Sequence, residues 1–229
     1  MPACLSYLPN TVLARSSENP ATDGPLHMPH SIAAVLRPLG LQHLGDCADG
    51  TSTISLIGPD EPRFWPIFTA STEYQDGRDN PLDRWSQRVI GKVAQDCAAE
   101  ALFPLGGPPY APFFPWAKRS GRFWASPIDF LVHIESGLFV SFRGALRWAV
   151  PAQDVKVSQP CMTCAQPCKT ACPVGAFDDG YNVADCKAHV TSDAGHDCRA
   201  NGCLARRACP VGQGVRLPEQ AAFHMEAFL

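Results

Sequence analysis

The sequence has few charged residues and no long hydrophobic run. Charged residues make up 18% of the 229 residues, and the formal net charge is −3. Without an excess of Lys and Arg, we expect no broad basic face for nucleic acid. No run of about 18 apolar residues occurs, so no membrane span is expected. The first twenty residues lack a basic n-region and an unbroken apolar stretch, which predicts no secretory signal.

Motifs of nucleotide-binding and hydrolytic enzymes are also missing. There is no G-x-G-x-x-G loop and no Walker A loop, and no Ser/His/Asp arrangement can be assembled from the sequence. Glycine, proline and cysteine are abundant instead. The 18 Gly and 22 Pro make up about 17% of the chain, against roughly 12% in average proteins, which predicts a loop-rich fold. The 11 Cys need a separate explanation.

The N-terminal part shows local patterns of helix and strand. Residues 1–29 have no usable periodicity and are interpreted as a flexible arm. Apolar spacing predicts a helix over 30–41, which Pro38 should end or kink, and a strand over 51–57.

The clearest helix is predicted to begin at Asn80, whose side chain would cap it, with Pro81 at the first helical position. Phe103-Pro104 is expected to end this helix. Gly91 lies inside it at a cost of up to about 1 kcal/mol relative to Ala, which favours a close packing contact there.

Two apolar segments, 130–134 and 138–142, predict a hairpin around Glu135-Ser136-Gly137. The composition changes at Pro151, because the closely spaced cysteines all lie beyond it. We therefore expect a domain boundary at this proline, between residues 30–150 and 151–229.

Eight cysteines beyond Pro151 form two runs with related endings. The first run is Cys161-x2-Cys164-x3-Cys168-x3-Cys172-Pro173; Cys186 follows, and the second run is Cys198-x4-Cys203-x5-Cys209-Pro210. Both runs end in Ala-Cys-Pro-Val-Gly. Eight thiolates in two runs that close on Cys-Pro are typical of two [4Fe–4S] clusters.

The ligand sets follow from the rule that the fourth Cys of a run binds the other cluster in two-cluster ferredoxins. One cluster is then predicted on Cys161, Cys164, Cys168 and Cys209, and the other on Cys172, Cys186, Cys198 and Cys203. Two structural zinc sites would also take four thiolates each, although zinc needs neither the Cys-Pro endings nor the crossed ligand. Four ligands leave no open iron, so both clusters are expected to carry electrons. His189 and His196 lie beside these ligands, but eight thiolates already suffice.

The sequence indicates the roles of the remaining cysteines and of the nearby arginines less clearly. Cys97 is expected to be a small core residue, and Cys4 and Cys47 have no assigned role. Arg206 and Arg207 would raise a cluster potential or dock an acidic redox partner, or else are solvated charges. A cysteine-rich chain in a reducing compartment uses thiolates mainly as metal ligands, which favours the cytoplasm.

Three segments resemble a known cluster module. PCMTCAQPCKTACPVGAF, DCKAHV and GCLARRACPVG are similar to the double-cluster module at the C-terminus of epoxyqueuosine reductases and reductive dehalogenases. FPLGGPPYAPFFPWAKRSG and SPIDFLVHIESGLFVSFRGAL resemble a widespread bacterial group of ferredoxin-like proteins, and the resemblance covers about residues 30–229. The hairpin is distantly similar to the fold of cobalamin-processing proteins, which is related to nitroreductases.

In those relatives the clusters pass electrons to a corrinoid, so the resemblance implies that residues 30–150 hold an acceptor, either a corrinoid (cobalamin) or a flavin. The sequence departs from the pattern in three places. The second run is more loosely spaced, and the His-Pro of related hairpins is His133-Ile134 here. The acidic proton donor of epoxyqueuosine reductases has no counterpart before Ser126, so queuosine chemistry is not expected.

The acceptor is predicted to bind in a concave site lined by Tyr110, Trp116, His133 and Arg143. A core histidine and a structural ion pair are the alternatives for His133 and Arg143.

The predicted fold class is therefore α+β: an N-terminal α/β domain over 30–150 and a C-terminal ferredoxin-like double-cluster module over 151–229. Three functions are open. The first is an electron carrier for a soluble partner of the flavodoxin or ferredoxin-reductase type. The others are a corrinoid- or flavin-dependent reductase, and a non-redox protein with structural metal sites.

Overall fold

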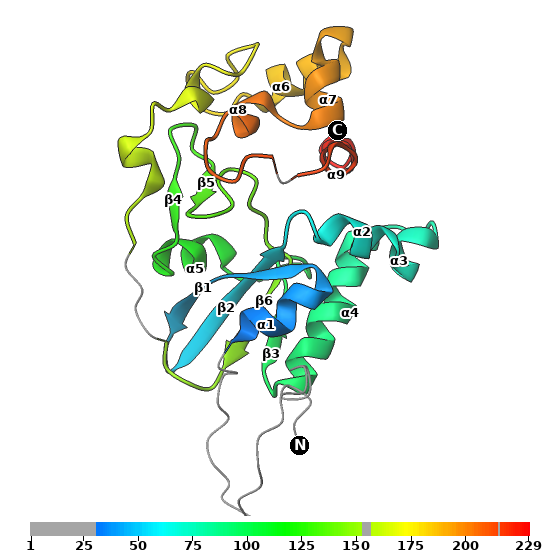
Figure 1. The fold of residues 1–229 in the computed structure, drawn as a ribbon, viewed down its shortest axis with the longest axis vertical. Helices are drawn as coiled ribbons and strands as arrows, with labels where there is room; N and C mark the ends of the chain where they lie inside the picture. The colour runs from blue at the N-terminus through cyan, green and yellow to red at the C-terminus, as the bar shows by residue number, and fades with distance from the viewer. Residues whose placement is uncertain (1–30, 153–156, 215) are drawn as a thin grey trace, which may run out of the picture.

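The computed structural model describes residues 31–152, 157–214 and 216–229, and the predicted arm over 1–29 lies outside these ranges. Short helices and small antiparallel sheets make up the fold, which confirms the mixed class predicted from the sequence. One part is built on a sheet, and the other contains the cysteine runs (Figure 1).

The main sheet has four antiparallel strands in the order β1-β2-β6-β3. The strands are β1 Leu41–Asp49, β2 Ser52–Pro59, β3 Glu100–Leu102 and β6 Gly144–Trp148. Strand β2 confirms the strand expected over 51–57. Strand β1 was not expected, because a bulge between His43 and Gly45 breaks its apolar alternation.

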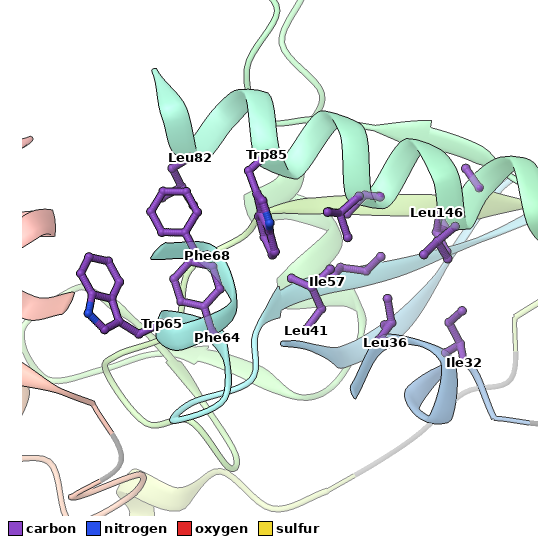
Figure 2. Close-up of a cluster of buried hydrophobic side chains, with 14 of the residues drawn as sticks. Ile32, Leu36, Leu41, Ile57, Phe64, Trp65, Phe68, Leu82, Trp85 and Leu146 are labelled. Carbon is purple, nitrogen blue, oxygen red and sulfur yellow. The ribbon is translucent and has the colours of Figure 1, made fainter. Parts of the chain in front are cut away.

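Helices α1 (Ile32–Leu36) and α4 (Pro81–Asp96) bury their apolar faces against this sheet. As predicted, the α-helix ends before Pro38, and residues Arg37–Leu39 form a 3-10 turn. Figure 2 shows how α4 supplies Trp85 to an aromatic layer with Phe64 and Phe68. Trp85 meets Phe64 edge-on at 5.4 Å between ring centroids, a favoured aromatic geometry.

Helix α4 differs from the prediction in its start, its interior and its end. Asn80 lies in the left-handed region (φ 52°), and its side chain makes no capping hydrogen bond. The helix stops at Asp96 and not at Phe103-Pro104, because the chain turns at Ala98 (φ 51°) to enter β3. An added Cβ at Gly91 would find no atom within 4 Å, so the close contact expected there is wrong.

This open space makes Gly91→Ala a stabilising change. We expect the free energy of unfolding to rise by about 0.5–1 kcal/mol, because Ala restricts the unfolded chain and meets no neighbour in the folded one. Urea unfolding followed by circular dichroism measures the effect. Gly144→Ala is the control: its Cβ would lie 2.9 Å from Ile90 Cδ1 and 3.1 Å from the Leu102 carbonyl, so it should destabilise the fold. Equal effects of the two variants would contradict this account.

A second core lies around α5 (Phe113–Arg119), where Phe113 and Trp116 pack with Leu44, Leu56 and Phe123. Next to it, β4 (Phe123–Ala125) pairs with β5 (Leu131–His133) in a two-stranded sheet.

The hairpin predicted over 130–142 is half right. Strand β5 forms, but 138–142 is not a strand, and only a single bridge joins His133 to Gly137. Leu138 packs instead in a third core beside the cysteines, and Phe142 contacts Phe113 and Phe123. Long-range packing thus separates the second arm from β5.

The rest of the chain forms short helices. They are α2 Phe64–Thr69, α3 Thr72–Gln75, α6 Val183–Thr191, α7 His196–Asn201, α8 Leu204–Arg207 and α9 Pro218–Glu226. Helix α9 packs on the sheet half, because Phe223 lies 5.4 Å from Trp65 and 5.7 Å from Phe68 between ring centroids. Among the described residues, no helix combines the length and apolar character that crossing a membrane requires.

Candidate metal centre

One set of four thiols lines a hollow in the second half of the chain. Two 3-10 turns, Pro160–Thr163 and Pro167–Lys169, both begin with proline and carry or adjoin three of these cysteines. The fourth comes from the residue pair Cys209-Pro210 beyond α8. The lining cysteines are Cys161, Cys164, Cys168 and Cys209. Ser126, Val132 and Leu138 of the first half close the hollow from the other side.

The other set lines a separate hollow. Its cysteines come from the loop before α6, from α6, from α7 and from the residue that precedes α8. They are Cys172, Cys186, Cys198 and Cys203. The two groups have the same membership as the ligand sets predicted from the crossed-ligand rule. His189 lines this second hollow but is not needed to complete four sulfurs.

Backbone N–H groups are aimed at several of the sulfurs. Gln166 N donates to Cys164 Sγ and Ala176 N to Cys172 Sγ, both at 3.3 Å. At α8, backbone N–H groups of Ala205 and Arg206 donate to the Cys203 sulfur. Such donors stabilise thiolates and tune the potential of a cluster that the thiolates bind.

Burial acts in the opposite direction on the free thiols. It raises the pKa of Cys161, Cys168, Cys198 and Cys203, with neighbouring cysteines adding to the shift at Cys161 and Cys168. Thiols in these positions stay protonated unless a cation is present. A bound metal centre would supply that positive charge and release the protons.

Within residues 31–152, 157–214 and 216–229, no three His, Cys, Asp or Glu side chains converge on a point where a single metal ion could sit. A tetrahedral zinc site would bring its sulfurs to within about 3.8 Å of one another. The thiols of the two sets lie instead on the linings of two hollows.

Ala205 lies between the two hollows. Its side chain is fully buried, packs with Cys168 and Cys209, and also lines the hollow of the other set. The methyl group of Ala205 therefore packs with thiols of one set and lines the hollow of the other.

Two glycines allow the first half to approach this centre. Gly137 (φ 58°) has the Val211 carbonyl oxygen 2.1 Å and Cys209 Sγ 3.2 Å from the position of an added Cβ. At Gly212 an added Cβ would lie 2.7 Å from the Ser136 carbonyl oxygen. Only glycine fits where these two backbones meet. The sequence indicated a turn at Gly137 but not its contact with the backbone at Gly212.

The structure does not gather the residues of the predicted acceptor site. Tyr110 is 67% exposed, whereas Trp116 is buried in the α5 core. His133 is fully buried: its Nε2 lies 3.0 Å from the Leu44 carbonyl oxygen and its Nδ1 3.1 Å from Ser136 Oγ. Burial lowers the pKa of His133 to about 4, so it is a neutral core histidine.

Arg143 lies elsewhere and is half-buried, and desolvation lowers its pKa to about 10. Its Nε has no hydrogen-bond partner, and no ion pair of Arg143 occurs among the described residues. The expected face is therefore filled by the protein's own side chains.

The neighbouring arginines of α8 have different surroundings. Arg207 forms an ion pair with Asp197 at 2.5 Å and its guanidinium bonds the Gly202 carbonyl oxygen. Arg206 turns inward and lies over the Phe130 ring at 5.1 Å. The sequence alone does not show that Arg206 and Arg207 have different surroundings.

Two cysteines outside the runs lie in the first half. Cys47 is 2% exposed in the α5 core, where burial raises its pKa to about 11, so it is an unreactive thiol. Cys97 is disulfide-bonded and only partly buried at the edge of the α4 core, so the expectation of a simple core cysteine is wrong. Cys4 lies outside the described residues.

Comparison with protein-family models, curated proteins and solved structures finds no match to this chain.

Proposed function

We propose that this chain is an iron–sulfur electron-transfer protein with two [4Fe–4S] clusters. It would exchange electrons with a soluble partner of the flavodoxin or ferredoxin-reductase type and pass them to an acceptor at the first domain. One observation carries the proposal: each hollow is lined by four thiols, and the membership of the sets crosses between the two runs.

When bound, such clusters supply one-electron storage at low potential. The protein's part is to hold, shield and tune them. Apolar side chains cover both hollows, including Val132 and Leu138 on one and Val190 and Leu204 on the other. The backbone donors at α8 stabilise negative charge on sulfur, and the Ala205 methyl group lies beside thiols of both sets.

Anaerobic isolation with metal analysis tests the proposal. We expect about eight irons and eight sulfides per chain, two clusters of four each. Two zincs without sulfide would overturn it in favour of structural metal sites. Cobalt or flavin retained along with the iron would replace the carrier by a reductase.

The different surroundings of the α8 arginines give a further prediction. Arg206→Gln should lower the midpoint potential of the cluster at Cys203 by about 60 mV, the one-electron equivalent of a tenfold change, because a nearby buried cation favours the reduced state. Arg207→Gln should have a much smaller effect, since Asp197 already offsets its charge. Redox titration followed by electron paramagnetic resonance measures both. Equal shifts would show that burial of the charge is not the cause.

A further inference from the structure

A third hollow lies where α9 and α8 meet the first half of the chain. Its cavity volume is about 210 Å³, against about 20 Å³ for either thiol-lined hollow. The side chains that decide its chemistry are Phe130, Phe139, Tyr181, Arg206, Arg216 and His224. Aromatic rings thus face cationic and imidazole groups across one space.

The polar groups of this hollow lack partners. The buried Nε atoms of Arg206 and Arg216 and Nε2 of His224 have no hydrogen-bond partner. Arg216 still binds Glu61 Oε1 at 3.1 Å and the Phe139 carbonyl oxygen at 3.0 Å. In the described part of the chain, the side chain of Arg206 makes no hydrogen bond and no ion pair. The buried Nε of this half-buried guanidinium would gain a hydrogen bond if a ligand supplied an acceptor.

The charges indicate a ligand with one negative charge. The Glu61 carboxylate offsets Arg216, and burial with three nearby arginines lowers the pKa of His224 to about 3, which leaves its imidazole neutral. Arg206 is therefore the lining arginine without a carboxylate partner among the described residues, and the Cys203 thiol is the anionic group nearest to it in charge terms. A planar guanidinium matches a carboxylate in a two-bond geometry, whereas a phosphate monoester brings close to two negative charges.

The walls indicate a flat apolar body. Arg206 stacks over Phe130 at 5.1 Å and Arg216 over Phe139 at 4.7 Å, which holds both guanidinium groups at the rings. Phe177 and Tyr181 stack on each other with centroids 5.0 Å apart and add a second aromatic surface. Rings favour other rings in offset or edge contact.

We propose that this hollow binds a flat aromatic monocarboxylate, with the carboxylate held by Arg206 and His224 and the ring packed among Phe130, Phe139 and Tyr181. Cys186 and Cys203 line the same hollow, so the ligand lies against the second thiol set. Binding follows from the hollow itself. Only a role for the ligand as electron acceptor rests on the proposed function.

Calorimetric titration of the anaerobically isolated full chain tests the site with matched probes. 2-Naphthoate should bind at least tenfold more tightly than 2-naphthamide, which has the same ring system without the charge. Arg206→Gln should remove this difference, and His224→Phe should weaken naphthoate binding about fivefold. Arg207→Gln, one residue along α8 but outside the hollow, should leave both affinities unchanged.

Equal affinity for naphthoate and naphthamide, or equal losses in Arg206→Gln and Arg207→Gln, would overturn the site. Tighter binding of 2-naphthyl phosphate than of naphthoate would overturn the monocarboxylate class. Circular dichroism and iron content of each variant separate lost binding from lost folding. If the protein lacks iron but binds naphthoate through Arg206, the electron-transfer function fails and the site stands.

Discussion

Replacing Cys161 with alanine should halve the iron and sulfide content of the protein, and replacing Cys209 as well should lower it no further. The two residues are 48 positions apart in the sequence but line the same hollow. Alanine offers no ligand atom, so the first substitution already removes the cluster that both thiols would hold. We expect about four irons per chain in both single variants and in the double variant.

The contrasting pair is Cys161 and Cys172, which belong to one run but line different hollows. Their double replacement should remove nearly all the iron. Cys47→Ala is the control, because this thiol is buried in the α5 core away from both hollows and should leave eight irons in place. The opposite result would be an iron content of about four in the Cys161/Cys172 double variant and near zero in the Cys161/Cys209 double variant. In that case each run binds its own cluster and the crossed assignment fails.

Local patterns predicted the local parts of this structure well. Proline stopped α1, apolar spacing located β2 and α4, and the cysteine spacing grouped the thiols as the three-dimensional structure does. These features depend on neighbours a few residues away. The cysteine pattern also predicts a grouping of residues that are distant in the sequence, because the crossed-ligand rule pairs the last cysteine of one run with the other run.

The features that the sequence did not predict depend on distant partners. Phe139 and Phe142 leave the expected strand because they pack on residues from separate helices and loops. His133 and Arg143 resemble site residues in a sequence, and only the fold shows that they are buried apart from each other. Arg206 and Arg207 are adjacent in the sequence, but one faces Phe130 and the other Asp197.

Removing the negative charge of Glu61 should have the largest effect on stability. Glu61 is 6% exposed in its side chain and pairs with Arg216, which is 9% exposed, so the pair links the sheet half to the segment before α9. Glu61→Gln would leave the Arg216 charge buried without a counter-charge. We expect a loss of about 3–5 kcal/mol, lowering the melting temperature by roughly 10 °C in a chain of this size. Thermal unfolding of the iron-loaded protein measures it.

The pair itself contributes little, and a double variant separates the two effects. Burial raises the pKa of Glu61 despite Arg216 and lowers the pKa of Arg216 despite Glu61, so desolvation outweighs their attraction. Glu61 Oε2 and Arg216 Nε also lack hydrogen-bond partners. Glu61→Leu combined with Arg216→Met should therefore recover most of the stability that Glu61→Gln loses. Glu219→Gln, exposed on α9, is the control and should change the melting temperature little. A double variant as unstable as the single one would mean that the pair's own attraction, and not the orphaned charge, holds the two halves together.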